Sequence, residues 1–395
     1  MTNDVKKVPE LRFPEFESEW KNKNLENIVD FAKGKLLGKK DLIDKGRYPC
    51  ILYGELYTKY GPIINDVVSR TDVNKDKLKK GSKNQILIPS SGETTEDIAT
   101  ASTLNTNEDV YIGGDLNILT PKEDDGKFIS LSLNGVNKRN MAKLAQGKTV
   151  VHLYNNDIKT LNINLPNKIQ EQQKIGEFFS KLDRQIELEE QKLAKLEEQK
   201  KGYMQKLFSQ ELRFKDQDGN HYPKWEKKFI KDIFIFENNR RKPITSSLRE
   251  KGLYPYYGAT GIIDYVKDYL FNNEERLLIG EDGAKWGKFE KSSFIANGQY
   301  WVNNHAHVVK SNNHNLYFMN YYLNFKELRT FVTGNAPAKL THENLCNINL
   351  EIPCLNEQGK ISALLKSIDN KMNNQINKIV LLKRRKQGLL QKMFV

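Results

Sequence analysis

The fold is decided by residues 175–207, IGEFFSKLDRQIELEEQKLAKLEEQKKGYMQKL, in which apolar residues recur at alternating spacings of four and three. This spacing places them along one side of an α-helix. The members of this seam are Ile175, Phe179, Leu182, Ile186, Leu193, Leu196, Tyr203 and Leu207. Glu189 and Lys200 occupy the two remaining positions of the series. The predicted helix is about 50 Å long at roughly 1.5 Å per residue, too long for an ordinary domain helix.

The same seam recurs 186 residues later, with Gln375 and Lys386 at its two polar positions. Its apolar members are Ile361, Leu365, Ile368, Met372, Ile379, Leu382, Leu389 and Met393. Residues 171–208 and 357–394 share twelve identities. Two matched heptad seams predict a coiled coil, which must be antiparallel because the first helix leads the chain away and the second leads it back. The alternative is that each amphipathic helix lies on its own domain.

Length and charge restrict the class of protein. A chain of 395 residues predicts two or three domains. Its net charge of +13 favours a polyanionic partner, nucleic acid before an acidic membrane surface. We expect no membrane segment and no signal peptide, because no apolar run is long enough and charged sequence follows Met1. Cys50, Cys346 and Cys354 lack CxxC spacing, which predicts neither disulfide nor zinc site and indicates a reducing cytoplasm.

A second duplication gives the chain a cyclic order. The segment Leu-Arg-Phe at 11–13, followed by Trp20, corresponds to the same letters at 212–214, followed by Trp225. The first copy opens the chain and the second follows the first long helix, so we expect the N-terminal arm beside Phe394, as its counterpart lies beside Phe208. The predicted divisions are an arm (1–20), a first domain (21–165), a first spacer helix (166–208), a linker arm (209–225), a second domain (226–352) and a second spacer helix (353–395).

The two globular domains share the order and spacing of their predicted elements but differ in the sequence between them. Strands are predicted over 85–88 and 110–112 in the first domain and over 276–279 and 294–296 in the second. Helices are predicted over 127–145 and 315–332, stopped by Gly147 and Gly334, and a turn over 90–92. Nineteen residues separate Gly147 from Pro166 and also Gly334 from Pro353. The fold class is therefore α+β, with two mixed α/β domains separated by a long antiparallel two-helix coiled coil in a pseudo-twofold arrangement.

No sequence motif indicates a catalytic site convincingly. Pro-Pro does not occur, which excludes the Asn/Asp-Pro-Pro-aromatic loop of amino-group methyltransferases. Residues 283–288 imitate a phosphate-binding loop but are one residue short. Asp125-Gly126-Lys127 could end a nuclease Asp-x-Lys pair, although a surface turn is the simpler interpretation. His305 and His307 could bind metal, but no third ligand is evident. We therefore expect no enzyme activity, no metal and no cofactor in this chain.

Basic and aromatic residues recur in the same order in both domains. Lys and Arg neutralise phosphates, and polar side chains read base edges. The candidate DNA-binding residues are Lys35, Lys39, Lys40, Arg47, Tyr53, Tyr57, Lys59, Ser91, Thr94, Lys148 and His152 in the first domain, and Arg240, Arg241, Lys242, Tyr256, Tyr257, Thr260, Lys285, Trp286, Lys339 and His342 in the second. The alternatives are solvated surface charges and, after the two glycines, ordinary helix-to-strand connections.

At this point the chain resembles the specificity (S) subunits of type I restriction-modification systems over nearly its whole length. The resemblance lies in Asn-Ile-Asn-Leu-Pro166 with Glu171-Gln172, Asn-Leu-Glu-Ile-Pro353 with Glu357-Gln358, the heptad helices and the cyclic arms. The family often has paired prolines before Glu-Gln, whereas single prolines occur here. The resemblance implies two target recognition domains, each reading one half of a bipartite asymmetric DNA sequence, with the helix pair setting the gap.

The same resemblance implies the partners and their cofactors. Two methyltransferase subunits would bind one specificity chain and use S-adenosylmethionine, and ATP- and Mg-dependent restriction subunits would join them. Catalysis would then belong to the partners. Two other interpretations remain: a coiled-coil scaffold that binds nucleic acid without sequence preference, and a nuclease that uses Asp125.

Overall fold

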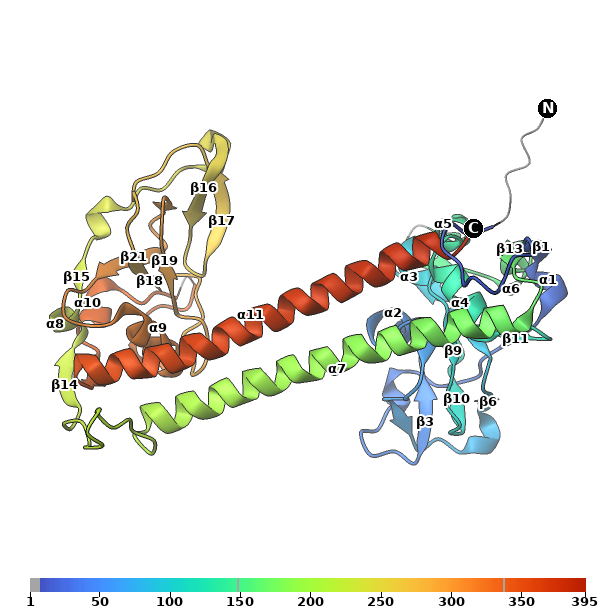
Figure 1. Ribbon diagram of the computed structural model, residues 1–395, viewed down its shortest axis with the longest axis horizontal. Coiled ribbons are helices and arrows are strands. Elements are labelled where there is room, and N and C mark those ends of the chain that lie inside the picture. The colour runs from blue at the N-terminus through green and yellow to red at the C-terminus, as the bar shows by residue number, and fades with distance from the viewer. Residues whose placement is uncertain (1–7, 148, 337) are drawn as a thin grey trace. The chain divides into compact units, whose positions relative to one another are not determined.

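The computed structural model describes residues 8–147, 149–336 and 338–395 of a mixed α/β protein (Figure 1). The chain divides into two compact units. Unit 1 runs up to Glu189 and includes Lys378–Val395, and unit 2 is Glu190–Asn377. Each unit therefore contains one globular domain and a part of each long helix. Within the described residues, no helix is long and apolar enough to cross a membrane.

Both predicted seams are confirmed as long helices. Helix α7 spans Ile169–Phe208 and helix α11 spans Leu355–Lys392. Each begins shortly after a proline that directly follows a strand, because proline disfavours the helical conformation in the residue before it, so that the helix begins only beyond the proline. Their surfaces are rich in Lys, Glu, Gln and Leu, which have high helix propensity. These residue types favour the helical conformation along the whole of both segments, which are longer than the helices of an ordinary domain.

The two helices contact each other in antiparallel orientation within each unit. In unit 1, Asp183 pairs with Lys386, and Glu189 Oε1 lies 2.9 Å from Lys378 Nζ. A residue later in α7 therefore contacts a residue earlier in α11, as antiparallel helices require. In unit 2, Lys200 Nζ lies 2.6 Å from Asp369 Oδ1. Three of the four polar seam positions, Glu189, Lys200 and Lys386, thus form interhelical ion pairs. The alternative of two helices that only lie on their own domains is wrong.

In unit 1 the main sheet has the strand order β2-β11-β7-β9-β4 and a second sheet has the order β5-β3-β10-β6. Helix α4 packs against β7 and β9, with Phe128 and Leu131 in the core. The elements are β1 (Lys21–Asn24), α1 (Leu25–Ile28), β2 (Val29–Lys33), η1 (Lys39–Asp41), β3 (Tyr48–Ile51), α2 (Tyr53–Thr58), β4 (Ile63–Ile64), β5 (Arg70–Thr71), η2 (Lys75–Lys77), β6 (Lys79–Gly81), β7 (Ile86–Pro89), β8 (Ser91–Gly92), α3 (Thr95–Ile98), β9 (Ser102–Leu104), β10 (Val110–Ile112), β11 (Leu116–Pro121), α4 (Gly126–Asn134), α5 (Lys138–Lys143), β12 (Val151–His152), α6 (Asn155–Ile158) and β13 (Asn162–Leu165).

In unit 2 the two larger sheets have the orders β15-β21-β18-β19 and β17-β16-β20. Helix α9 lies against the first half of α11 (Figure 1), where Phe318 and Tyr322 share a core with Ile361 and Leu365. The elements are β14 (Glu226–Phe229), α8 (Ile230–Ile233), β15 (Ile235–Phe236), η3 (Asn238–Arg240), η4 (Ser246–Leu248), β16 (Lys251–Tyr257), β17 (Ile262–Val266), β18 (Arg276–Gly280), β19 (Ser293–Ala296), β20 (Trp301–Val302), β21 (Ala306–Lys310), α9 (Leu316–Phe325), η5 (Arg329–Phe331), α10 (His342–Cys346) and β22 (Asn349–Ile352).

Two predicted helices are shorter than expected. Helix α4 ends at Asn134, and a separate helix α5 follows, because the C-cap Gly135 leaves the helical region of the backbone, with φ −95° and ψ −111°. Helix α9 ends at Phe325, where Lys326 turns extended, and only a 3₁₀ turn follows. The turn predicted over 90–92 contains the short strand β8.

A buried carboxylate at the start of α7 ties the N-terminal arm to unit 1. Arg12 Nε donates to Glu171 Oε1 at 2.7 Å, and Trp20 Nε1 donates to the same oxygen at 3.2 Å. The backbone N–H of Leu11 donates to the carbonyl of Lys392 at 2.9 Å. The arm therefore lies against the C-terminal end of α11, as the cyclic repeat predicts.

Unit 2 contains the same clamp. Arg213 Nη2 donates to Glu357 Oε2 at 2.6 Å and Trp225 Nε1 donates to it at 3.2 Å. Leu212 N–H donates to the carbonyl of Lys206 at 2.9 Å, the counterpart of the Leu11 bond. Glu357 is fully buried, so its charge depends on these donors.

The glutamine beside each clamp glutamate fixes the globular domain to the long helix. Gln172 Oε1 accepts the backbone N–H of Asp125 at 2.9 Å, and its amide donates to the carbonyl of Pro166 at 3.2 Å. Gln358 accepts the backbone N–H of Asn315 at 2.8 Å. Asp125 and Asn315 are the N-caps of α4 and α9, so each glutamine orients the main helix of its domain.

Removing the arginine of a clamp should destabilise the unit strongly. Arg213→Ala leaves the Glu357 carboxylate buried without its charge partner, which costs about 3–5 kcal/mol. Urea unfolding followed by tryptophan fluorescence measures this loss. The control is Arg47→Ala, since the Arg47–Asp72 pair is exposed and solvent screens its attraction, so that its loss should change the free energy of unfolding little. Equal losses in the two variants would contradict this role of the clamp.

An acidic pH should weaken unit 2 through Glu274. A hydrogen bond from Arg240 lowers the pKa of Glu274 from 4.5 to about 2. Because the folded pKa lies below the unfolded one, this stabilisation is complete above pH 4.5 and is lost as the pH falls toward 2. Urea unfolding at successive pH values should show a shallower loss for Glu274→Gln than for the parent chain. An unchanged pH slope would contradict this assignment.

Candidate nucleic-acid interface

Each globular domain carries a short hairpin that begins at a glycine in the left-handed region. In the first domain Gly147 has φ +118°, and Gln146 and His152 exchange backbone hydrogen bonds at 2.9 and 2.7 Å. A Cβ atom at Gly147 would lie 2.1 Å from the carbonyl oxygen of Val150, so glycine is required there. The hairpin continues into β12, which pairs with β8 and places His152 opposite Ser91.

The second domain repeats this construction. Gly334 has φ +80°, and Thr333 and Lys339 exchange backbone hydrogen bonds at 2.8 Å in both directions. Lys339 also forms a backbone bridge to Asp282, two residues after the end of β18. Ser91 and His152 in the first domain therefore correspond to Asp282 and Lys339 in the second.

The matched positions carry different chemistry. Ser91 Oγ lies 3.2 Å from His152 Nδ1, and the His152 ring stacks on Tyr154. In the second domain Asp282 Oδ2 lies 3.4 Å from Lys339 Nζ. A further histidine, His305, contacts the other carboxylate oxygen at 2.5 Å. One edge thus presents a hydroxyl and an imidazole group, and the other presents a carboxylate with an ammonium and an imidazole group beside it. Lys148 lies outside the described residues.

Four candidates of the first domain surround one cavity. Lys39, Tyr53, Tyr57 and Lys59 line a cavity of about 750 Å³ beside α2. Lys59 is paired inside the domain, 2.7 Å from Glu55 Oε1. Burial in the cavity wall raises the pKa of Tyr57. This cavity is the main concave feature that the candidates of unit 1 share.

The other candidates of the first domain lie apart from the cavity wall. Lys35 and Lys40 are exposed. Arg47 is exposed, pairs with Asp72 and lies over the ring of Tyr48. Thr94 is the N-cap of α3 and accepts the backbone N–H of Asp97. Arg47 and Thr94 therefore already have partners within the domain.

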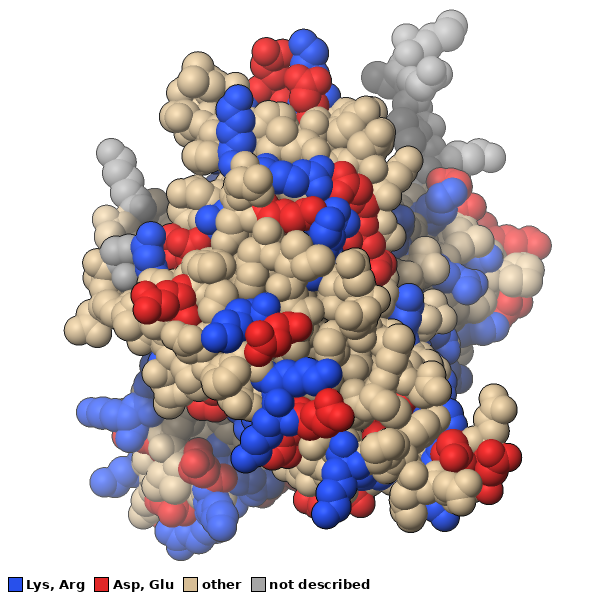
Figure 2. All heavy atoms as spheres, turned by 90° about the vertical axis from the view of Figure 1, so that its left-hand side faces the viewer, with Lys and Arg blue, Asp and Glu red and all other residues tan. Residues whose placement is uncertain are grey.

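In the second domain two arginines are engaged internally. Arg240 donates two hydrogen bonds of 2.7 Å to Glu274. Arg241 donates to Glu281 at 2.6 Å and to the carbonyl of Ala306 at 3.0 Å. Figure 2 shows the same mixture of charge: Lys and Arg are interspersed with Asp and Glu over the visible face. This face is therefore not a uniform basic patch.

Two aromatic candidates lie inside the domain and have no surface to offer DNA. Tyr256 is buried, and its hydroxyl accepts the backbone N–H of Ile244 at 2.9 Å. Trp286 is buried in the core and donates to the carbonyl of Gly280 at 3.1 Å. Their aromatic rings stabilise the sheet packing instead.

The remaining candidates of the second domain are more accessible. Tyr257 is half-buried against Phe294, and His342 packs edge-on against Phe236. The exposed candidates are Lys242, Thr260 and Lys285. Whether any of these side chains contacts DNA stays a prediction.

The motifs that suggested a nuclease or a metal site have structural roles. Asp125 caps α4 by accepting the backbone N–H of Phe128 at 2.9 Å. His307 is buried and lies 2.8 Å from the carbonyl oxygen of Leu340, and burial lowers its pKa. His305 precedes β21 and contacts Asp282. Across the described ranges, no group of three or more His, Cys, Asp or Glu residues could hold a metal ion.

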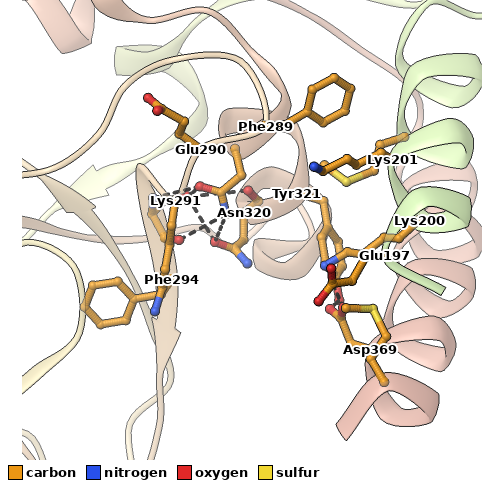
Figure 3. A pocket seen from close by; sticks show the side chains of 14 residues that line it. Glu197, Lys200, Lys201, Phe289, Glu290, Lys291, Phe294, Asn320, Tyr321 and Asp369 are labelled. Atoms are coloured by element: carbon orange, nitrogen blue, oxygen red, sulfur yellow. Dashed lines mark hydrogen bonds and ion pairs between the residues drawn. The ribbon is translucent and has the colours of Figure 1, made fainter. Parts of the chain in front are cut away.

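The sequence did not indicate a polar junction between the helix pair and the second domain (Figure 3). Tyr321 donates to Asp369 Oδ2 at 2.6 Å, and Lys200 pairs with Asp369 Oδ1 at 2.6 Å. These residues line a pocket of about 410 Å³ together with Asn320 and Phe294. The charged seam position of Lys200 was the one available signal, but nothing in the sequence pointed to Tyr321.

Comparison with known proteins agrees with this architecture. The family model of the type I restriction modification DNA specificity domain matches residues 17–198 and 222–381. A putative type I restriction enzyme specificity subunit of Haemophilus influenzae is 40% identical over 148 residues, 36% of this chain and 37% of that protein. The EcoprrI specificity subunit of Escherichia coli is 29% identical over 126 residues, 32% of this chain and 30% of that protein. These alignments span less than half of either relative.

Solved structures resemble the whole chain. The S subunit of a type I restriction-modification system from M. genitalium superimposes with a TM-score of 0.65 and 18% identity, over 98% of this chain and 99% of that one. A chain from a study of assembly and conformational transition of the type I R-M system gives a TM-score of 0.56 and 13% identity, over 96% and 98%. At such identities the likeness shows the fold. With two matched domains that cover most of its length, the chain belongs to the type I restriction modification DNA specificity family.

Proposed function

We propose that this chain is a non-catalytic DNA sequence-specificity subunit whose two domains each read one half of a bipartite, asymmetric target. The supporting observation is the pair of equivalent hairpin edges with unlike chemistry. Ser91 and His152 offer a hydroxyl and an imidazole, whereas Asp282 and Lys339 offer a carboxylate and an ammonium group beside the imidazole of His305. Equal frames with different side chains suit a target whose halves differ in sequence.

The helix pair would set the gap between the two half-sites. Its ion pairs allow one register, because sliding one helix would separate Asp183 from Lys386 in unit 1 and Lys200 from Asp369 in unit 2. Polar seam residues commonly fix register in coiled coils. A fixed register supports a fixed number of base pairs between the half-sites.

Catalysis would belong to partner subunits. We assign methyl transfer to two methyltransferase subunits that use S-adenosylmethionine, and restriction to ATP- and Mg-dependent subunits, with one specificity chain per complex. The duplicated clamps around Glu171 and Glu357 support two equivalent docking positions, since each unit repeats the same contact between an arm and the start of a long helix.

The complex with its methyltransferase should bind one bipartite duplex at one gap length. Methylome sequencing of cells that carry the gene identifies the target, and fluorescence anisotropy measures binding. Lengthening the gap by a single base pair should abolish specific binding. Affinity should fall roughly 10³-fold or more between about 50 and 200 mM salt if six or more phosphates are contacted. Equal competition by random duplex would instead favour a scaffold without sequence preference.

Substitutions at the two hairpin edges should act on different half-sites. Asp282→Asn and Lys339→Gln should relax base selection in the half-site that unit 2 reads, by about 1–3 kcal/mol per lost base contact. Ser91→Ala should relax the other half-site alone, which makes it the matched control. Binding selections from a randomised duplex library measure both. Relaxation of both half-sites by either substitution would contradict separate reading.

A further inference from the structure

The cavity of unit 1 has the size and lining of a small-ligand site. It lies between residues 37–42, helix α2 and the turn at 113–115, and its volume is about 750 Å³. Small-molecule sites typically measure about 300–1,000 Å³ and have mostly apolar walls. Its apolar and aromatic lining residues are Leu37, Leu42, Leu52, Tyr53 and Tyr57. A flat ring system could lie against the two tyrosines.

One wall of the cavity is held in an unusual backbone conformation. Leu36 and Leu37 have φ values of +51° and +60°, a region that leucine rarely adopts. The segment is held by a 2.6 Å hydrogen bond from Gly114 N–H to the carbonyl of Leu36. At Gly34, a Cβ atom would lie 1.8 Å from the Gly113 carbonyl oxygen, so the two backbones pack directly together. Strained backbone of this kind clusters at functional sites.

This conformation presents a large apolar side chain to solvent. The Leu36 side chain is 54% exposed, although leucine is normally buried. DNA-bending proteins insert leucine and similar side chains between base pairs as wedges. Leu36 stands next to Leu37, which lines the cavity, so a base displaced by the wedge would have a receptor nearby.

The charges around the cavity suit a nucleotide. Lys35, Lys39 and Lys40 are exposed, and in the part of the chain that the structure describes none of them forms an ion pair. The lining itself contains Glu93 and Asp115, which would repel a phosphate from the interior. These charges therefore favour the phosphate backbone beside the exposed lysines and an uncharged ring inside the cavity.

We infer that this cavity receives an unstacked nucleobase from the bound duplex, with Leu36 filling the space left in the base stack and Tyr53 and Tyr57 against the displaced ring. The inference rests on the proposed function and adds base extrusion by the specificity chain itself. The shared ligand chemistry is a nucleobase ring, whose source is either the duplex or a free nucleoside.

The test uses the complex with its methyltransferase and a duplex that carries the target. Each base opposite the half-site read by unit 1 is replaced in turn by an abasic residue, which removes the cost of unpairing. At one position we expect about tenfold tighter binding, since unpairing costs a few kcal/mol. The double variant Tyr53→Ala, Tyr57→Ala should lose this gain, and Tyr57→Phe should keep it.

The wedge is tested in the same assay. Leu36→Ala should weaken binding to the fully paired duplex several-fold and affect the abasic duplex less. Leu253→Ala is the control, because this leucine is 88% exposed in β16 of unit 2 and should change neither affinity. Thermal unfolding of every variant, unchanged from the parent chain, shows that the fold persists.

Several outcomes would overturn the inference. The inference is wrong if no abasic position tightens binding. It is also wrong if the tighter binding persists in the Tyr53→Ala, Tyr57→Ala variant, because the unpaired base would then enter the methyltransferase and not this cavity. Calorimetry with free adenosine gives the second arm: micromolar binding without any abasic effect would make the cavity a nucleoside site. A complex that fails to select half-sites and gap disproves the proposed function, whereas one that selects them without responding to unpairing disproves only this inference.

Discussion

Each unit depends on one buried carboxylate at the start of a long helix. Glu171 and Glu357 each bind an arginine and a tryptophan of an arm that arrives from elsewhere in the chain. A buried carboxylate without such donors would be strongly destabilising, so arm and helix form together. Because Gln172 and Gln358 follow directly, the N-cap of the domain's main helix is fixed from the same turn.

The interhelical ion pairs serve specificity more than stability. Lys200 and Asp369 retain 23% and 29% side-chain exposure, so solvent screens their attraction and the net gain is small. Leucines in the same positions would bury more apolar surface, but apolar seams tolerate several registers. We infer that the charged residues in the otherwise apolar seams serve to fix the register of the two helices.

The long helices, their antiparallel contact and the cyclic placement of the arm could be predicted from the sequence, because periodicity and repetition are local signals. Partners distant in sequence could not. No sequence pattern indicates that Arg240 forms an ion pair with Glu274 or that the side chain of Tyr256 is buried. The loops after Gly147 and Gly334 were matched by spacing, but their pairing with β8 and with Asp282 depends on sheet geometry. The cavity beside α2 likewise arises only after distant segments pack.

The bond between Leu11 and Lys392 has a consequence for how the polypeptide is threaded. Leu11 and Lys392 belong to one unit, whose construction matches that of unit 2, where the same bond joins residues of a continuous segment. The contact between arm and helix end is thus the same whether the two are close in sequence, as in unit 2, or far apart in sequence, as in unit 1. A circularly permuted gene, opened within 209–225 and joined across the old ends by a linker, would encode the same set of native contacts.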